Sequence, residues 1–124
     1  MPPVAVALVG ASNDRSKFGN KAVRAYLRQG YRVYPVNPRE QSIEGLPAYR
    51  SVLDIPEAID RVTFYVPPQV GLKVIEEVAE KGAREVYLNP GSESAELVEK
   101  AKALGLNPIV AYSMLAIGLQ PDDL

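Results

Sequence analysis

Residues 4–12 read VAVALVGAS, an apolar run that ends in a glycine followed by two small residues. The apolar part, residues 4–9, shows no alternation of apolar and polar side chains. That pattern is typical of a strand buried on both faces of a parallel sheet. Four further short segments have the same character, and they are residues 31–36, 62–66, 85–88 and 108–112. The sequence therefore predicts five buried parallel strands.

Amphipathic stretches separate these strands. Apolar residues recur at helical spacing before Gly30, Gly82 and Gly105, and a strand segment follows each glycine. A glycine in this place is typical of a helix end because it adopts the left-handed conformation without steric cost. Strands that alternate with helices predict a parallel sheet with right-handed crossovers. We expect one Rossmann-like, doubly wound α/β domain over residues 1–124, with helices on both faces and the strand order 3-2-1-4-5.

The composition excludes several classes of function. The chain has 124 residues, with 14 Lys and Arg against 15 Asp and Glu, and it contains no His, Cys or Trp. Nearly equal numbers of basic and acidic residues argue against a nucleic-acid binder. No apolar run is long enough to span a membrane. Without Cys the chain has no disulfide and no thiolate nucleophile, and without His it has no imidazole base. The usual zinc ligands are absent as well. We expect a cytoplasmic protein with no metal site, no nucleic-acid partner and no membrane contact.

The loop after the first strand carries the clearest functional signal. Gly10, Ala11 and Ser12 have small side chains, and Gly19 opens the next helix. Small residues let backbone N–H groups at a helix N-terminus approach an anion. Hydroxyl and cationic groups come from Ser12, Arg15, Ser16 and Lys17. These features favour a phosphate site over a plain surface loop, although neither a Walker A nor a G-x-G-x-x-G motif is present. On this hypothesis, Gly10→Val would abolish binding with less effect on folding.

The loops after the second and third strands indicate the kind of nucleotide. The second strand ends in Asn37, Pro38 and Arg39, without the acidic residue that holds the ribose hydroxyls of NAD. An arginine there suits a ribose-linked phosphate, as in NADP or coenzyme A, and equally suits a solvated loop charge. The loop after the third strand contains Val66, Pro67 and Pro68. These residues could form a rigid apolar wall against a nucleotide base, or they could simply be the proline-containing start of the next helix.

Together these stretches resemble the CoA-binding domain family. This family comprises the Rossmann-like domain of the succinyl-CoA synthetase α-subunit and related stand-alone CoA-binding proteins. The resemblance is carried by residues 6–12, 17–20, 30–31, 33–38, 45–49, 51–52 and 65–68. It implies coenzyme A or an acyl-CoA as the ligand. Gly10, Ala11 and Ser12 would then cradle phosphate, with Lys17 and Gly19 nearby. The adenosine would be bordered by Asn37, Pro38 and Arg39, with Val66, Pro67 and Pro68 completing the wall.

The sequence also departs from this family. Ser113 stands where many members have a cysteine, and no histidine is present for the phosphoryl relay of the larger synthetases. We therefore expect a stand-alone coenzyme A or acyl-CoA binding module without catalytic groups of its own. Two alternatives stay open: the NADP-binding domain of a redox enzyme or sensor, and a subunit of an acyl-CoA synthetase or acyltransferase completed by a partner chain. A protein partner or a homo-oligomer is compatible with each interpretation.

Overall fold

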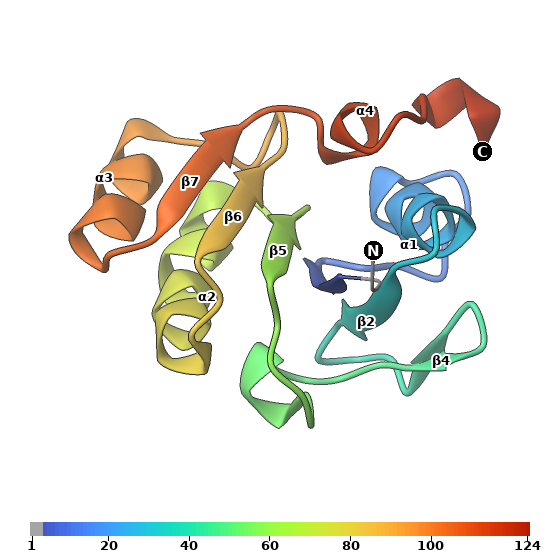
Figure 1. Cartoon of the computed structure of the whole chain (residues 1–124), viewed down its shortest axis with the longest axis horizontal. Coiled ribbons are helices and arrows are strands. Elements are labelled where there is room, and N and C mark those ends of the chain that lie inside the picture. Colours follow the sequence, from blue (N-terminus) through green and yellow to red (C-terminus); the bar gives the residue numbers. More distant parts are fainter. Residues whose placement is uncertain (1–3) are drawn as a thin grey trace.

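Five parallel strands form the central sheet of the computed structural model, which describes residues 4–124 (Figure 1). In sheet order they are β2 (Arg32–Val36), β1 (Ala5–Val9), β5 (Arg61–Phe64), β6 (Glu85–Leu88) and β7 (Asn107–Val110). The predicted fold class, a doubly wound parallel α/β sheet, is confirmed. The predicted strand order 3-2-1-4-5 is wrong, because the order of the five strands along the chain is 2-1-3-4-5.

The segment after β2 explains this difference in strand order. It forms a two-stranded antiparallel hairpin, β3 (Ser42–Ile43) and β4 (Leu46–Pro47), and then passes along the free side of β2. There the N–H of Tyr49 donates to the carbonyl of Pro35 over 2.9 Å. Tyr49 therefore takes the position in which an outer strand would pair, and β5 lies on the other side of β1. Both strand orders have the same alternation of elements, so the alternation cannot distinguish them.

Both edge strands of the sheet carry a proline that faces outward. The carbonyl of Pro35 points to the outer side of β2, where it accepts the bond from Tyr49. On β7, the N–H of Asn107 donates to Arg84 on the β6 side, so the next residue, Pro108, faces the free edge. A proline in such a position removes no hydrogen bond from the sheet. It also lowers the number of free donors at an edge that could otherwise pair with another chain.

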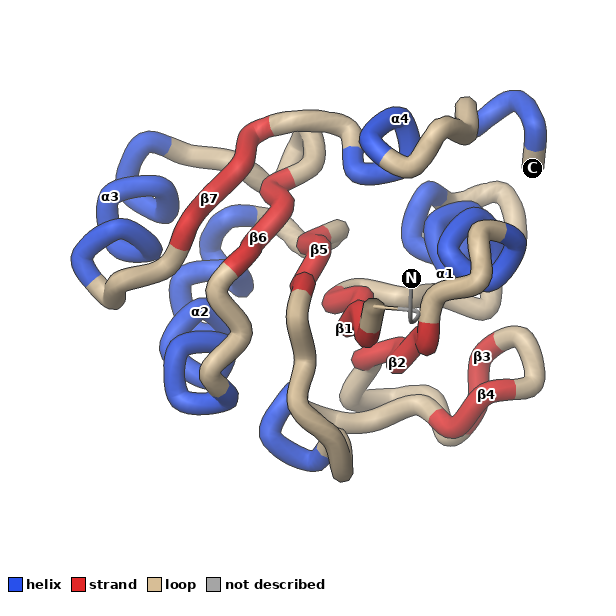
Figure 2. The backbone as a smooth tube through the Cα atoms, in the orientation of Figure 1, coloured by secondary structure: helices blue, strands red, loops and turns tan. Residues whose placement is uncertain are grey.

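Helices cover the sheet on both faces (Figure 2). One face carries α1 (Phe18–Arg28) and the short α4 (Ser113–Ala116). The other carries α2 (Pro68–Lys81), α3 (Ala95–Ala103) and the 3-10 turn η1 (Val52–Asp54). Successive residues of β1 alternate between these faces, because Val6 and Leu8 pack with α1 while Ala5, Ala7 and Val9 belong to the core under α2 and α3.

The helix ends follow the sequence prediction. Gly82 ends α2 in the left-handed conformation at φ +92°, and Gly30 and Gly105 follow α1 and α3 at φ +85° and +81°. After α4 the chain returns across α1 and finishes in a second 3-10 turn, η2 (Pro121–Asp123). Within residues 4–124, no helix combines the length and the apolar composition needed to cross a membrane.

Candidate functional site

The strand order places a crevice between β1 and β5. The chain leaves β1 for β2 on one side, and it continues through β5, β6 and β7 on the other. Ligands of open α/β sheets bind at such a switch point, outside the carboxyl ends of the strands. The structure has a pocket of about 450 Å³ there, which we call the first pocket. It is lined by Gly10, Ala11, Ser12, Lys17, Phe18, Gly19, Asn37, Tyr65, Val66, Pro67, Pro90, Gly91 and Ser92.

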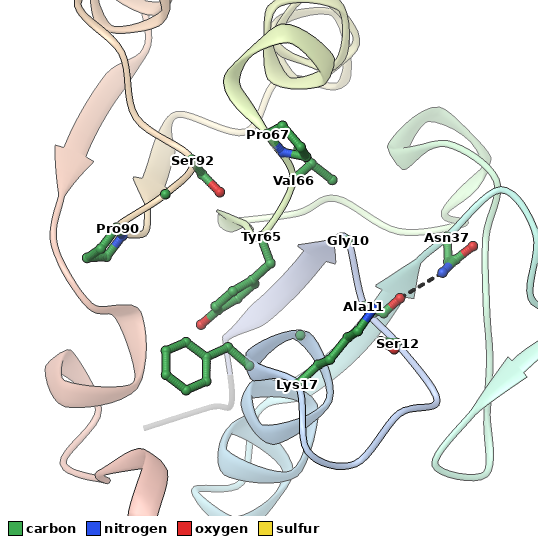
Figure 3. A pocket seen from close by; sticks show the side chains of 13 residues that line it. Gly10, Ala11, Ser12, Lys17, Asn37, Tyr65, Val66, Pro67, Pro90 and Ser92 are labelled. Carbon is green, nitrogen blue, oxygen red and sulfur yellow. Dashed lines mark hydrogen bonds between the residues drawn. The ribbon is translucent and has the colours of Figure 1, made fainter.

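Figure 3 shows how three loops build the first pocket. Gly10, Ala11 and Ser12 lie at one side, and Pro90 and Ser92 lie at the other. The loop after β5, with Tyr65 and its two successors, stands between them. The predicted phosphate loop therefore meets the loops after β5 and β6 in one place.

Two glycines let the first loop pack tightly against its neighbours. Gly10 has φ +89°, and a Cβ there would lie 2.9 Å from the carbonyl carbon and oxygen of Tyr65. A Cβ on Gly19 would lie 2.3 Å from the carbonyl oxygen of Gly10. Real Cβ atoms do not approach backbone so closely, so both sites require glycine for the fold itself. Gly10→Val, which the sequence leads us to expect to abolish binding with less effect on folding, therefore also strains the fold.

Backbone donors at the start of α1 are free. Among residues 4–124, the N–H groups of Ala11, Ser12, Phe18 and Gly19 have no hydrogen-bond acceptor. No side chain caps this helix, whose N-cap residue is Lys17. The first N–H groups of a helix need outside acceptors, and the helix dipole favours a negative one. The loop therefore offers an anion site built from backbone amides beside a lysine.

Two asparagines hold the loop in this conformation. The Nδ2 of Asn37 donates to the carbonyl of Ala11 over 2.8 Å, and the Nδ2 of Asn20 donates to the carbonyl of Ser12 over 2.9 Å. Because a peptide unit is planar and trans, fixing the Ala11 carbonyl also fixes the opposite direction of the Ser12 N–H. Asn20 is fully buried and was not among the predicted site residues. A polar residue on the buried side of an amphipathic helix is the signal that could have found it.

A second pocket of about 530 Å³ adjoins the first and shares Gly10, Asn37, Val66 and Pro67 with it. Its wall is largely apolar, and the valines of that wall are Val9, Val36, Val66, Val70 and Val74. Arg39 and Arg50 also line it. In the described part of the chain, neither arginine forms an ion pair with a carboxylate, and nor does Lys17. An apolar slot beside unpaired cations suits a flat base that carries an anionic group.

The structure gathers most of the predicted binding residues. The first pocket contains Gly10, Ala11, Ser12, Lys17, Gly19, Asn37, Val66 and Pro67, and the second adds Pro38 and Arg39. Arg15 and Pro68 line neither pocket. Arg15 pairs instead with Glu44 over 3.3 Å, and Pro68 begins α2.

Ser16 also turns away from the predicted role. Its hydroxyl and its N–H both donate to Asp14, over 2.6 and 3.0 Å. These bonds lower the pKa of the Asp14 carboxyl. The serine hydroxyl is therefore occupied in stabilising a turn of the loop.

Several lining residues were not predicted, and they are Val9, Phe18, Val36, Arg50, Tyr65, Val70, Val74, Glu77 and residues 90–92. The loop at residues 90–92 follows a strand, so the rule for carboxyl-end loops points to it. Arg50 carries no comparable signal. It reaches the second pocket because the hairpin brings its segment along β2, and no local pattern shows that path.

A buried polar network lies among the elements beside the first pocket. Asn89 donates to Thr63 Oγ1 over 2.7 Å and to the Phe64 carbonyl over 2.8 Å, and it accepts the N–H of Ser113 over 2.9 Å. Ser113 is fully buried, and its hydroxyl bonds to that of Tyr26. Burial raises the pKa of Tyr26, so this phenol is no base at neutral pH. The network stabilises the fold and leaves Ser113 unreachable for a substrate.

These features define a class of protein. A doubly wound sheet with a glycine loop, an uncapped helix N-terminus and unpaired cations at the switch point is a nucleotide-binding α/β domain. Comparison with known families is more specific. The model of the CoA binding domain family matches residues 4–118, and the chain belongs to that family. The predicted resemblance is thereby confirmed, as is coenzyme A as the predicted ligand.

Named relatives agree with this assignment. The chain is 36% identical over 118 residues to the acetate–CoA ligase [ADP-forming] II subunit alpha of Pyrococcus furiosus, covering 86% of this chain and 26% of that protein. A solved hypothetical protein from Pyrococcus horikoshii OT3 has 35% identity and a TM-score of 0.85, over 90% of this chain and 79% of that one. The apo dinucleotide forming acetyl-coenzyme A synthetase 1 of Ca. Korarchaeum cryptofilum has 33% identity and a TM-score of 0.77, over 88% and 26%. The chain thus spans about a quarter of the two enzymes.

Proposed function

We propose that this chain is a non-catalytic module that binds coenzyme A or an acyl-CoA across the two pockets. The diphosphate lies against the free amides of the first loop and Lys17. The adenine packs on the valine wall of the second pocket, and the ribose phosphate lies toward Arg39 and Arg50. The observation that carries the proposal is the set of unpaired N–H groups at the start of α1, directly beside an unpaired lysine.

The family match favours coenzyme A over NADP, because the matching model is that of a CoA binding domain. NAD is disfavoured separately, because the end of β2 carries Asn37 and offers no carboxylate for its ribose hydroxyls. The side chain of Asn37 is already engaged, since it donates to the Ala11 carbonyl and accepts the N–H of Arg39 over 2.8 Å. It is therefore a support of the loop.

The proposal of a module without chemistry rests on the surroundings of the serines. Ser113 is buried against Tyr26, as described above. Ser12 lines the first pocket, and its Oγ accepts the N–H of Asp14 over 3.0 Å. The nearest acidic group in the loop, Asp14, has a lowered pKa, which makes it a weaker base than an ordinary carboxylate. No base within the described residues is arranged to activate either hydroxyl.

A second candidate function is the CoA-binding component of an acyl-CoA ligase. It is favoured by one observation, namely that a relative of 36% identity bears the name of an alpha subunit of an ADP-forming acetate–CoA ligase. In that case, the catalytic groups come from other domains or from a partner chain. Both functions share the same coenzyme A site.

Calorimetric titration tests the ligand assignment. We expect coenzyme A to bind with a Kd on the order of micromolar, and NAD to bind far more weakly. Dephospho-coenzyme A should bind roughly tenfold more weakly than coenzyme A, because it lacks the phosphate that we place by the arginines. Arg39→Gln combined with Arg50→Gln should remove this difference, whereas Arg84→Gln, at the other end of the sheet, should preserve it. Tight NAD binding without coenzyme A binding contradicts the proposal.

A turnover assay separates the module from an enzyme. The purified chain is mixed with acetyl-CoA and longer acyl-CoAs, and free thiol is followed with a thiol reagent. The chain contributes no thiol to the signal because it has no cysteine. We expect no release above the rate without protein. Steady release that is lost in Ser12→Ala would show that the module has a catalytic serine after all.

A further inference from the structure

Glu77 is the one acidic residue among the described residues that line the second pocket. It lies on α2, one helical turn beyond Val74 and two turns beyond Val70, and all three residues line this pocket. Residues at this spacing share one face of a helix. The apolar wall on which we place the adenine therefore ends in a carboxylate.

A hydrogen bond from another segment holds this carboxylate in place. The hydroxyl of Ser51 donates to Glu77 Oε1 over 2.6 Å. Ser51 is itself fixed, because it is the N-cap residue of η1 and its Oγ accepts the N–H of Leu53 over 3.1 Å. Glu77 is also half-buried. The carboxylate is therefore a positioned group at the edge of the pocket.

The second oxygen of the same carboxylate is free to accept a hydrogen bond. Within residues 4–124, Glu77 Oε2 takes part in neither a hydrogen bond nor an ion pair. Of the other polar side chains in the pocket, Arg39 and Arg50 can only donate. The amide of Asn37 is already engaged with the backbone of the two loops. Glu77 is therefore the side-chain acceptor that this pocket offers to the N–H of a ligand.

We propose that Glu77 accepts a hydrogen bond from the exocyclic amine of adenine and thereby selects adenine over bases that lack an amine at that position. This inference rests on the proposed function, in which the base packs on the valine wall. Val66 and Pro67, which line both pockets, lie just before α2, whereas Glu77 lies in the third turn of that helix.

The carboxylate is therefore at the end of the second pocket that is farther from the phosphates. The amine of adenine is on the six-membered ring, away from the bond to the ribose, so it is the part of the nucleotide that reaches farthest from the phosphates. The free acceptor and the donor of the base thus lie at the same end of the pocket.

Calorimetry with coenzyme A and with an analogue whose adenine carries hydrogen in place of the amine tests the inference. The analogue keeps the ring, the ribose and every phosphate, and it lacks only the donor. It should bind roughly tenfold more weakly than coenzyme A, because a hydrogen bond to a charged acceptor is lost. Equal affinities overturn the role of Glu77 but leave the coenzyme A site intact. Absence of coenzyme A binding contradicts the proposed function itself.

Two variants separate recognition of the amine from a purely structural role. Glu77→Met keeps the length of the side chain and removes both acceptor oxygens, so the ratio of the two affinities should fall from roughly tenfold to near one. Glu77→Gln keeps an acceptor for Ser51 and for the amine but removes the charge, so the ratio should fall to roughly threefold. Loss of a structural support would weaken both ligands alike and would leave the ratio unchanged.

Glu80→Met is the matched control. Glu80 is an exposed residue of the same helix and lines neither pocket, so its replacement should leave the ratio at its original value. A tenfold ratio that persists in both variants of Glu77 places the amine on another acceptor and overturns the inference.

Discussion

Replacing Gly10 with valine is expected to lower the free energy of unfolding by roughly 2–6 kcal/mol, through backbone strain and overpacking together. The strain arises because φ at this position is +89°, where a β-branched residue is a rare outlier. The overpacking arises because the new Cβ would lie 2.9 Å from the backbone of Tyr65. Since whole domains are stable by only about 5–15 kcal/mol, this loss is a large share of the total. Chemical denaturation of the two proteins measures it.

Gly30→Val provides the matched control. Gly30 has a similar φ of +85°, but a Cβ there would meet nothing within 4 Å. Both variants carry the backbone strain, and only the variant at Gly10 also carries the collision. Gly10→Val should therefore be less stable than Gly30→Val by roughly 1–3 kcal/mol. Equal stabilities would show that the loop after β1 yields easily and that tight packing is not what requires glycine there.

Reversing the charge of Lys17 is expected to weaken coenzyme A binding by roughly 30- to 150-fold, which corresponds to about 2–3 kcal/mol. Lys17→Glu removes an attraction to the phosphates and adds a repulsion at the same place. The residue is exposed, so solvent and salt screen both effects, and the loss should shrink as ionic strength rises. The fold should tolerate the change, because an acidic residue is favourable at a helix N-terminus.

Lys73→Glu is the control for the change in net charge. Lys73 is an exposed residue of α2 and lines neither pocket. Its reversal should alter the affinity only slightly. If Lys17→Glu and Lys73→Glu weaken binding equally, the lysine acts only through overall charge, and its place beside the phosphates is refuted.

Much of the fold could be predicted from local patterns. The apolar runs correspond to the five parallel strands, although β7 is not buried as predicted and its Val110 is exposed. The glycines at Gly30, Gly82 and Gly105 mark the helix ends. The strand order could not be predicted in the same way. It depends on the side of β2 along which the chain returns, and this is decided by the bonds of Tyr49 to the edge of β2. Those are contacts between distant segments, which composition and periodicity do not encode.

In the candidate site, too, the residues fixed by local sequence could be predicted, and those brought in by distant segments could not. Gly10, Ser12 and Lys17 were predictable because strand, glycine loop and helix follow one another in the chain. Arg50 was not predictable, because it reaches the second pocket from the segment that follows the hairpin and runs along β2. The role of Gly10 also changed, since the residue that its side chain would meet is Tyr65, more than fifty positions away. The sequence indicated the position of the proposed phosphate loop, whereas the packing that requires its glycine became visible only in the structure.

We expect coenzyme A to bind with its phosphates on the backbone amides at the start of α1. Amide nitrogen–proton NMR spectra recorded during a titration with coenzyme A distinguish this position from any other. The amide signals of Ala11, Ser12, Phe18 and Gly19 should shift most and saturate together. If coenzyme A binds while these four signals stay in place, the phosphates lie elsewhere on the protein.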